Sequence, residues 1–283
     1  MLGLSRLSAT ALFLGILLAS AGAAYAGLGQ PTPWQLGLQE AASPVMVDVI
    51  SFHNFLLWII TAITALVLIL LLIIIVRFNA RANPTPSRTT HNTPLEVIWT
   101  IVPVIILLLI AVPSFRLLFF QLDTPTPDLT LKATGKQWFW TYSYPDNGNF
   151  EFDSLFVPDK DLKPGQPRLL TVDNEIVVPV NKVVRVQVIG ADVIHSFAVP
   201  SFGIKIDAVP GRLNETWFKA TALGMFHGQC SELCGKNHAF MPITVRVVSE
   251  ADFTAWVAQA KQKYAGDDKA APATYAAAER PVR

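Results

Sequence analysis

The chain has 283 residues, of which 52% are hydrophobic, and its mean hydropathy is +0.41. Its 22 Lys and Arg are balanced by 21 Asp and Glu, so the formal net charge is only +1. This composition argues against a wholly soluble protein and predicts membrane helices plus one modest domain, and we expect no nucleic-acid partner.

Residues 1–26 have the features of a secretory signal peptide. Arg6 precedes an apolar stretch from Ala11 to Leu18, and the run Ala24-Tyr25-Ala26 follows it. A third membrane helix would need a longer apolar stretch. We therefore expect cleavage after Ala26.

Two longer apolar stretches follow within residues 27–123. The first spans Phe55 to Val76, and the second spans Val97 to Phe120 with Pro103 and Pro113 inside it. Each is long enough to cross the hydrocarbon layer of about 30 Å as a helix, and membrane helices tolerate proline. We predict a transmembrane helical hairpin.

Positive charge predicts the orientation of this hairpin. Arg77, Arg81 and Arg88 lie in the loop of residues 77–95, which contains no acidic residue, whereas residues 27–54 contain no Lys or Arg. The positive-inside rule places the connecting loop in the cytoplasm. We expect a two-pass protein of a bacterial-type inner membrane, with both termini on the periplasmic side.

Glu96 lies at the cytoplasmic end of the second stretch. The simpler interpretation is a solvated acid in the first turn of a helix, where the helix dipole stabilises it. Ionisable groups within membrane segments also mark proton routes. Both interpretations remain open from the residues alone.

Residues 124–262 change to short β-type runs separated by Gly and Pro turns, which is typical of an all-β sandwich. The predicted strands are Leu129–Ala133, Trp138–Tyr144, Leu169–Val172, Val183–Ile189, Thr216–Lys219 and Ile243–Val248. A closing helix is expected at about Asp252 to Lys263. The Ala-rich residues 263–283 are expected to form a disordered tail.

Four aromatic residues share one parity in the second predicted strand: Trp138, Trp140, Tyr142 and Tyr144. An extended strand places all four on one face. This pattern is typical of a packing stripe in a β-sheet domain.

One loop holds the only two cysteines, Cys230 and Cys234, followed by His238 and Met241. Thiolate and thioether are soft ligands, and with imidazole they suit copper. A disulfide would leave His238 and Met241 unexplained, and structural zinc sites rely on Cys and His without Met. A blue-copper site needs one Cys, so the second favours two copper ions bridged by two sulfurs.

A dinuclear site needs a second imidazole. His195 lies in a β-type run upstream of the loop, and His227 lies just before Cys230. Copper sites in β-sandwiches commonly take one His from a strand, which favours His195 over His227. His53 and His91 are interpreted as bystanders.

The copper loop Cys-Ser-Glu-Leu-Cys-Gly-Lys-Asn-His-Ala-Phe-Met, with the upstream run Gly190–Phe197, resembles subunit II of the haem-copper cytochrome c oxidases. The runs Gly135–Trp140 and Pro200–Arg212 resemble the same family. The resemblance extends from the first membrane helix to the end of the β domain. It implies a two-helix transmembrane hairpin followed by an all-β, cupredoxin-like Greek-key barrel.

The resemblance also implies a dinuclear copper centre. Its two thiolates bridge the ions, each imidazole binds one ion, and the thioether and the backbone carbonyl of Glu232 are axial ligands. The implied ligands are His195, Cys230, Glu232, Cys234, His238 and Met241.

Further roles follow from the same resemblance. Trp138 would be the point at which an electron enters from cytochrome c, with Asp192 and Asp173 in the docking surface. The Glu232 carboxylate would bind magnesium at the interface with a partner subunit, and Glu96 would lie at the mouth of a proton path.

The implied partners are the haem-copper catalytic subunit I, other oxidase subunits, cytochrome c and membrane lipid. Oxygen chemistry would belong to subunit I, so no catalytic residue is expected in this chain.

Three positions depart from the family pattern: Lys136, Ser143 and His227. The first two make the docking face less negative, and His227 is interpreted as lying behind the copper ligands or at the surface. A membrane-anchored copper-delivery or assembly protein is the alternative function. A delivery protein has no reason for a second His and a Met, and an assembly module would hold its Cys pair as a disulfide.

Overall fold

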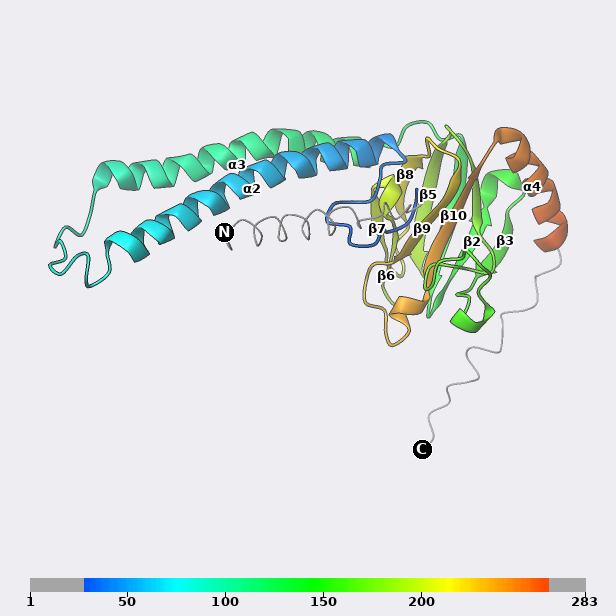
Figure 1. Cartoon of the computed structure of the whole chain (residues 1–283). Helices are drawn as coiled ribbons and strands as arrows, with labels where there is room; N and C mark the ends of the chain where they lie inside the picture. The colour runs from blue at the N-terminus through cyan, green and yellow to red at the C-terminus, as the bar shows by residue number, and fades with distance from the viewer. Residues whose placement is uncertain (1–27, 265–283) are drawn as a thin grey trace, which may run out of the picture.

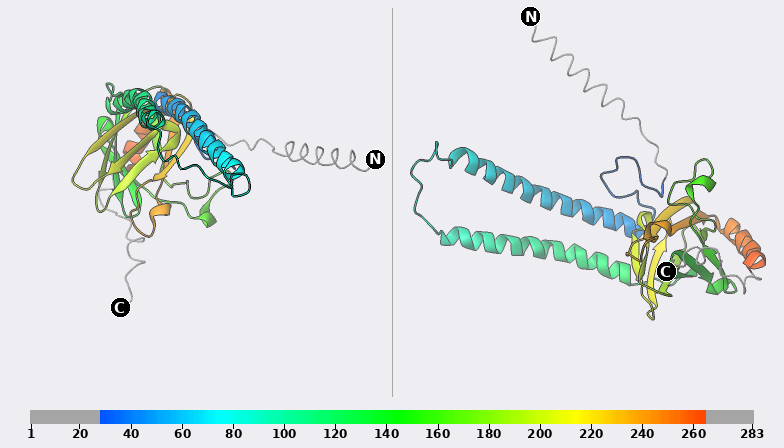
Figure 2. Two further views of the ribbon diagram at one scale, coloured as in Figure 1. Left: turned by 90° about the vertical axis from the view of Figure 1, so that its left-hand side faces the viewer. Right: turned by 90° about the horizontal axis from the view of Figure 1, so that it is seen from below.

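The computed structural model describes residues 28–264, so the expected signal peptide and nearly all of the expected tail lie outside the described residues. Two long helices run side by side away from a β domain, and a third helix covers the far end of that domain (Figures 1 and 2). The predicted helical hairpin and all-β domain are therefore both present.

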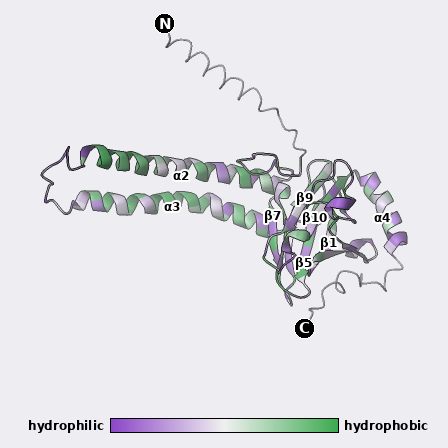
Figure 3. Cartoon of the chain, turned by 60° about the horizontal axis from the view of Figure 1, so that its bottom comes forward, coloured by the Kyte–Doolittle hydropathy of each residue, from purple (hydrophilic) through white to green (hydrophobic). Residues whose placement is uncertain are grey.

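The paired helices are α2, Pro44–Arg77, and α3, Thr93–Leu122, and both are long and apolar enough to cross a membrane. Figure 3 shows hydrophobic residues along most of their length. Both helices extend beyond the predicted stretches 55–76 and 97–120. The difference arises because hydropathy marks only the lipid-facing part, whereas helical structure continues to a capping residue at each N-terminus.

The hairpin is fixed to the β domain at the end where α2 begins and α3 ends. The N-cap Ser43 accepts a hydrogen bond from the Met46 backbone and donates one to the Phe202 carbonyl at 2.7 Å. At the end of α3, the Phe120 ring lies edge-on to Trp217, with centroids 5.4 Å apart. These contacts bury the first turn of α2 against the domain and explain why the helix begins earlier than hydropathy predicts.

The β domain contains two five-stranded sheets, ordered β3-β2-β1-β5-β8 and β4-β10-β9-β6-β7. Most neighbours are antiparallel, but β1–β5 and β4–β10 are parallel. The strands are β1 Leu129–Lys136, β2 Phe139–Tyr144, β3 Phe150–Ser154, β4 Ile176–Pro179, β5 Val183–Gly190, β6 His195–Val199, β7 Ile204–Ala208, β8 Asn214–Lys219, β9 Gly224–Cys230 and β10 Pro242–Val248.

The packing stripe on β2 is confirmed for Trp140, Tyr142 and Tyr144, which are fully buried. Tyr144 packs against Trp256 of helix α4, Glu250–Tyr264, with ring centroids 5.1 Å apart. Trp138 does not belong to the stripe, because β2 begins at Phe139 and Trp138 lies in the preceding turn, partly exposed.

Two further predictions need correction. Residues Leu169–Val172 form a turn with only an isolated bridge from Val172 to Phe156, because no strand lies beside them and Leu169 has a positive φ of 64°. Helix α4 continues to Tyr264, so residues 263 and 264 are helical and not part of a tail.

Candidate metal centre

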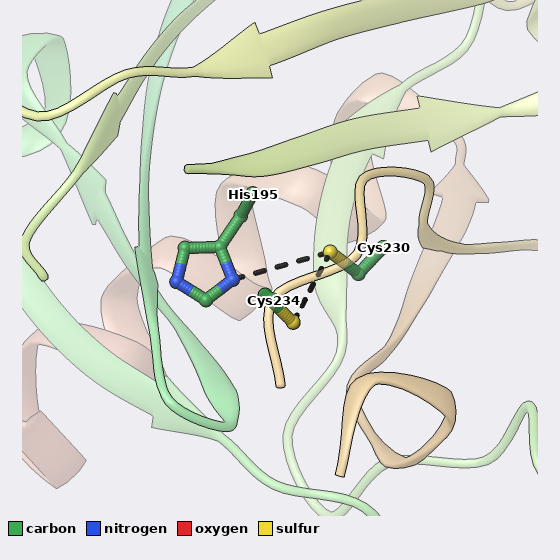
Figure 4. Close-up of side chains that lie close together, drawn as sticks. All are labelled: His195, Cys230 and Cys234. Atoms are coloured by element: carbon green, nitrogen blue, oxygen red, sulfur yellow. Dashed lines mark hydrogen bonds between the residues drawn. The ribbon is translucent and has the colours of Figure 1, made fainter. Parts of the chain in front are cut away.

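His195, Cys230, Cys234, His238 and Met241 lie close together and are called the cluster below. It forms where β6 begins and β9 ends, in the second sheet. Pairing of Phe197 with Cys230 brings His195, at the start of β6, beside the end of β9. The chain then turns through residues 231–237 and the short helix η4, His238–Phe240, before β10. Figure 4 shows His195, Cys230 and Cys234 directed toward one another.

The two thiols lie at the middle of the cluster, with their sulfurs 3.9 Å apart. Around Cys230, the His195 Nδ1 lies 3.9 Å and the Glu232 carbonyl oxygen 3.4 Å from the sulfur. Around Cys234, the corresponding distances are 3.4 Å to the His238 Nδ1 and 3.5 Å to the Met241 Sδ. Each sulfur therefore has one imidazole and one further donor.

The thiols are free, and 3.9 Å is far beyond the bond length of about 2.05 Å in a disulfide. A converging set of two thiols, two imidazole nitrogens and a thioether is soft, and it fits copper better than magnesium, calcium or manganese. Because each half supplies one thiol, one imidazole and one further donor, the arrangement fits two soft ions sharing the two sulfurs.

The cluster is closed on one side and open on the other. Cys230, Cys234, His195 and Met241 are buried, whereas His238 is partly exposed. Burial limits solvent access to the sulfurs, and the exposed imidazole edge gives the site a short route to the protein surface.

His195 is held by two neighbours. Its Nε2 lies 2.8 Å from the Asp192 carboxylate, which also accepts hydrogen bonds from the backbone N–H of Val193 and Gln137. On its other side, a Cβ at Gly135 would lie 2.9 Å from the imidazole ring. Gly135 therefore leaves the space that the ring occupies.

The charges within the cluster are coupled. Burial lowers the pKa of His195, but the Cys230 thiolate and the Asp192 carboxylate outweigh burial and raise it overall. Burial raises the pKa of Cys230, yet His195 and nearby backbone N–H groups lower it overall to about 7. The pKa of Cys234 is raised to about 12 by burial and by negative charge on Cys230. Cys230 is thus the first thiol to ionise.

The backbone carbonyl of Cys234 accepts two side-chain hydrogen bonds. Gln137 Nε2 donates at 2.8 Å and Trp138 Nε1 donates at 3.2 Å. Gly235, with a φ of +122°, permits this approach, since a Cβ there would lie 3.0 Å from the Trp138 ring. Sequence reasoning missed Gln137, because only the packing of the β1–β2 turn against the loop reveals its role.

The remaining predicted site residues lie apart from this cluster or at its edge. Glu232 is exposed, and only its carbonyl faces Cys230. The Asp173 carboxylate accepts hydrogen bonds from the backbone N–H of Leu155 and Asn174, far along the chain from the copper loop.

Glu96 lies in the first turn of α3 and accepts a hydrogen bond from the backbone N–H of Asn92 at 3.1 Å. The Asn92 side chain in turn accepts one from the Leu95 backbone. This reciprocal capping agrees with the simpler interpretation of Glu96 as a helix-terminal acid.

His227 is buried, not at the surface as one interpretation held. Its Nδ1 lies 3.1 Å from the Leu170 carbonyl and 3.3 Å from the Thr244 hydroxyl. His227 lies on the face of β9 opposite Cys230, because successive strand residues alternate between faces. It lines a separate pocket of about 260 Å³. Its burial depends on the loop at Leu170, which the sequence pattern does not reveal.

Comparison with known proteins agrees with this geometry. Residues 129–248 match the family described as cytochrome c oxidase subunit II, periplasmic domain, and residues 31–117 match its transmembrane domain. A probable cytochrome c oxidase subunit 2 of Rickettsia bellii is 54% identical over 238 residues, covering 84% of this chain and 88% of the relative. Cytochrome c oxidase subunit 2 of Oenothera berteroana is 48% identical over 231 residues, covering 80% of this chain and 90% of the relative.

Among solved structures, the periplasmic domain of cytochrome oxidase subunit II from Bradyrhizobium japonicum is 69% identical. It covers 50% of this chain and 99% of its own, with a TM-score of 0.48.

Proposed function

Because the chain belongs to the cytochrome c oxidase subunit II family, we propose that the paired thiols Cys230 and Cys234 hold its dinuclear copper centre. The chain is the subunit through which electrons enter a haem-copper oxidase complex, and the family binds a dinuclear copper centre. The carrying observation is that each thiol sulfur has its own imidazole within 3.9 Å and its own weaker donor within 3.5 Å.

The protein residues have distinct tasks in this proposal. Cys230 and Cys234 would hold the copper centre through their thiolates, His195 and His238 through one imidazole nitrogen each, and Met241 and the Glu232 carbonyl as weaker donors. When bound, the copper centre supplies reversible one-electron transfer. Burial of the sulfurs and the fixed imidazole of His195 keep the ligand positions similar in both redox states, which keeps reorganisation small.

Electrons would reach the cluster through Trp138. Its ring is partly exposed, and its Nε1–H donates a hydrogen bond to the backbone of Cys234. This gives a route from the protein surface to a copper ligand through one indole and one hydrogen bond. Asp192, beside this route, and Asp173 would attract a basic cytochrome c, while Lys136 reduces the negative charge of the surface.

Three further assignments extend the proposal to the rest of the complex. The exposed carboxylate of Glu232 would bind magnesium at the boundary with the haem-bearing subunit I, because an oxygen ligand suits a hard cation. Glu96 would lie at the mouth of a proton path. The arginine-bearing loop would face the cytoplasm, with the β domain on the periplasmic side of a bacterial inner membrane.

We also propose three segments: a signal peptide over residues 1–26, the membrane hairpin over 27–123 and the copper domain over 124–262. The copper-delivery and assembly alternatives are not favoured, because the relatives are oxidase subunits over most of the chain.

The test is to purify the full chain without partner subunits and to load it with copper. We expect two copper ions per chain, with one unpaired electron shared between them in the paramagnetic resonance spectrum. Cys234→Ser should abolish the shared signal, whereas Ser231→Ala, in the same loop but outside the cluster, should preserve it. A single exchangeable copper ion, or a Cys230–Cys234 disulfide without copper, would contradict the proposal.

A further inference from the structure

A second site lies between the two long helices, near their junction with the β domain. Here α2 and α3 flank an open pocket of about 520 Å³ whose lining is mostly apolar. The apolar lining is formed by Phe52 and Phe55 from α2 and by Pro113, Leu117 and Phe120 from α3.

Two opposite charges also line this pocket: Asp48 from α2 and Arg116 from α3. Within residues 28–264, neither side chain has a hydrogen-bond or ion-pair partner. An arginine in an apolar setting at the edge of a membrane is costly unless an anion or water accompanies it. The two charges therefore indicate a ligand that carries both signs.

The position of the pocket along the helices, relative to the borders of the membrane, indicates which ligand it takes. Arg116 lies about 20 residues beyond Glu96 on α3, which is roughly 30 Å at the rise of an α-helix. That length equals the thickness of the hydrocarbon layer. If Glu96 lies at one border of the layer, Arg116 lies at the other, at the level of the lipid phosphates.

We propose that this pocket binds one phospholipid of the outer leaflet with an amine headgroup, of the phosphatidylethanolamine class. The phosphate would lie on the Arg116 guanidinium, whose planar fork matches phosphate oxygens. The ammonium would lie on the Asp48 carboxylate, and the upper acyl chain would pack against the phenylalanine rings of the pocket. This site depends on the membrane hairpin and is independent of the copper assignment.

The first experiment measures lipid retained by the purified oxidase complex that contains this chain. Native mass spectrometry after stepwise detergent washing should find one phosphatidylethanolamine more in the parent complex than in Arg116→Gln. We expect Arg116→Gln and Asp48→Asn to lower retention roughly tenfold or more, since each removes a charge-assisted contact. Arg81→Gln, an arginine at the opposite end of the hairpin, is the matched control and should retain the lipid.

A second experiment uses the unmodified complex, so it does not depend on the variants assembling. Phosphatidylethanolamine with a photoreactive diazirine high on one acyl chain should crosslink to the peptide containing residues 113–120, and excess phosphatidylethanolamine should reduce the yield more than phosphatidylcholine. Equal lipid counts in all complexes and no crosslink to this peptide would overturn the proposal. A loss of subunit I from Arg116→Gln with an unchanged lipid count would overturn it too, because the partner subunit would then fill the pocket.

Discussion

Asp192 and His195 are joined by a hydrogen bond of 2.8 Å between the carboxylate and Nε2. Because a carboxylate accepts the bond, Nε2 carries the proton and the lone pair of Nδ1 faces Cys230. Asp192 thus selects the tautomer of His195 that is able to bind a metal, as carboxylates behind metal-bound histidines commonly do. One acid therefore lies both behind a proposed copper ligand and at the proposed docking surface.

This relationship predicts the effect of Asp192→Asn. A neutral acceptor holds the imidazole less firmly, so we expect copper affinity to fall roughly 10- to 100-fold, measured by competition with a copper chelator. Asp173→Asn removes an acid with a similar role in backbone hydrogen bonding and should leave copper affinity unchanged. Equal affinities in the two variants would show that Asp192 does not orient His195.

Trp138→Phe tests the proposed route for electrons. The variant keeps an aromatic ring but removes the N–H that bonds to the Cys234 carbonyl. We expect electron transfer from cytochrome c to slow by at least about tenfold, corresponding to about 1.4 kcal/mol in the barrier, with copper content and the copper spectrum unchanged. Stopped-flow reduction of the copper centre measures this rate.

Trp34→Phe provides the control for that experiment. Trp34 is 98% exposed and lies in the segment before α2, away from the copper loop in the chain. Its replacement should leave the rate unchanged. A normal rate in Trp138→Phe would remove the indole N–H from the route.

The copper loop was readable from the sequence because its donors are local. Cys230, Cys234, His238 and Met241 lie within one loop, so their convergence needs no knowledge of strand pairing. His195 reaches the cluster only through the pairing of β6 with β9, and sequence logic favoured it over His227 without deciding the matter. Gln137 could not be predicted, because its contact depends on how the β1–β2 turn packs on the loop.

The membrane hairpin was also predicted, but the helix ends that contact the β domain were not. Hydropathy marks where lipid surrounds a helix and is silent about Val45 and Met46, which are apolar because the β domain buries them. The failed strand at Leu169–Val172 has a related cause. The Leu170 carbonyl contacts His227 from outside the sheet and Val172 is buried, and burial of that kind resembles a strand in the sequence.

Gly235→Ala should combine two costs. The backbone there has a φ of +122°, and the added Cβ would press on the Trp138 ring. We expect the free energy of unfolding to fall by about 1–3 kcal/mol and electron transfer to slow, because the ring is displaced from Cys234. Denaturant unfolding and stopped-flow reduction measure the two effects.

Two glycines separate these costs. Gly165 has a φ of +87° but open space around its Cβ position, so Gly165→Ala should lower stability without changing the rate. Gly37 has neither constraint, and Gly37→Ala should change neither quantity. A normal rate in Gly235→Ala would mean that Trp138 tolerates displacement.

His227 gives a prediction about pH. Burial lowers its pKa, and the hydrogen bond to the Leu170 carbonyl offsets this only in part. The unfolded chain, with an ordinary pKa of about 6.5, therefore binds a proton before the folded protein does as pH falls. The stability contributed by the neutral imidazole is complete above about pH 6.5 and is lost progressively below it.

His227→Phe should therefore flatten the decline in thermal stability between about pH 7 and pH 5. The Leu170 carbonyl stays satisfied in the variant, because the Thr244 hydroxyl also donates to it at 2.8 Å. His91→Phe, which removes an exposed histidine from the loop between the helices, should leave the slope unchanged. If both variants decline with pH as steeply as the parent, protonation of His227 is not what destabilises the fold in acid.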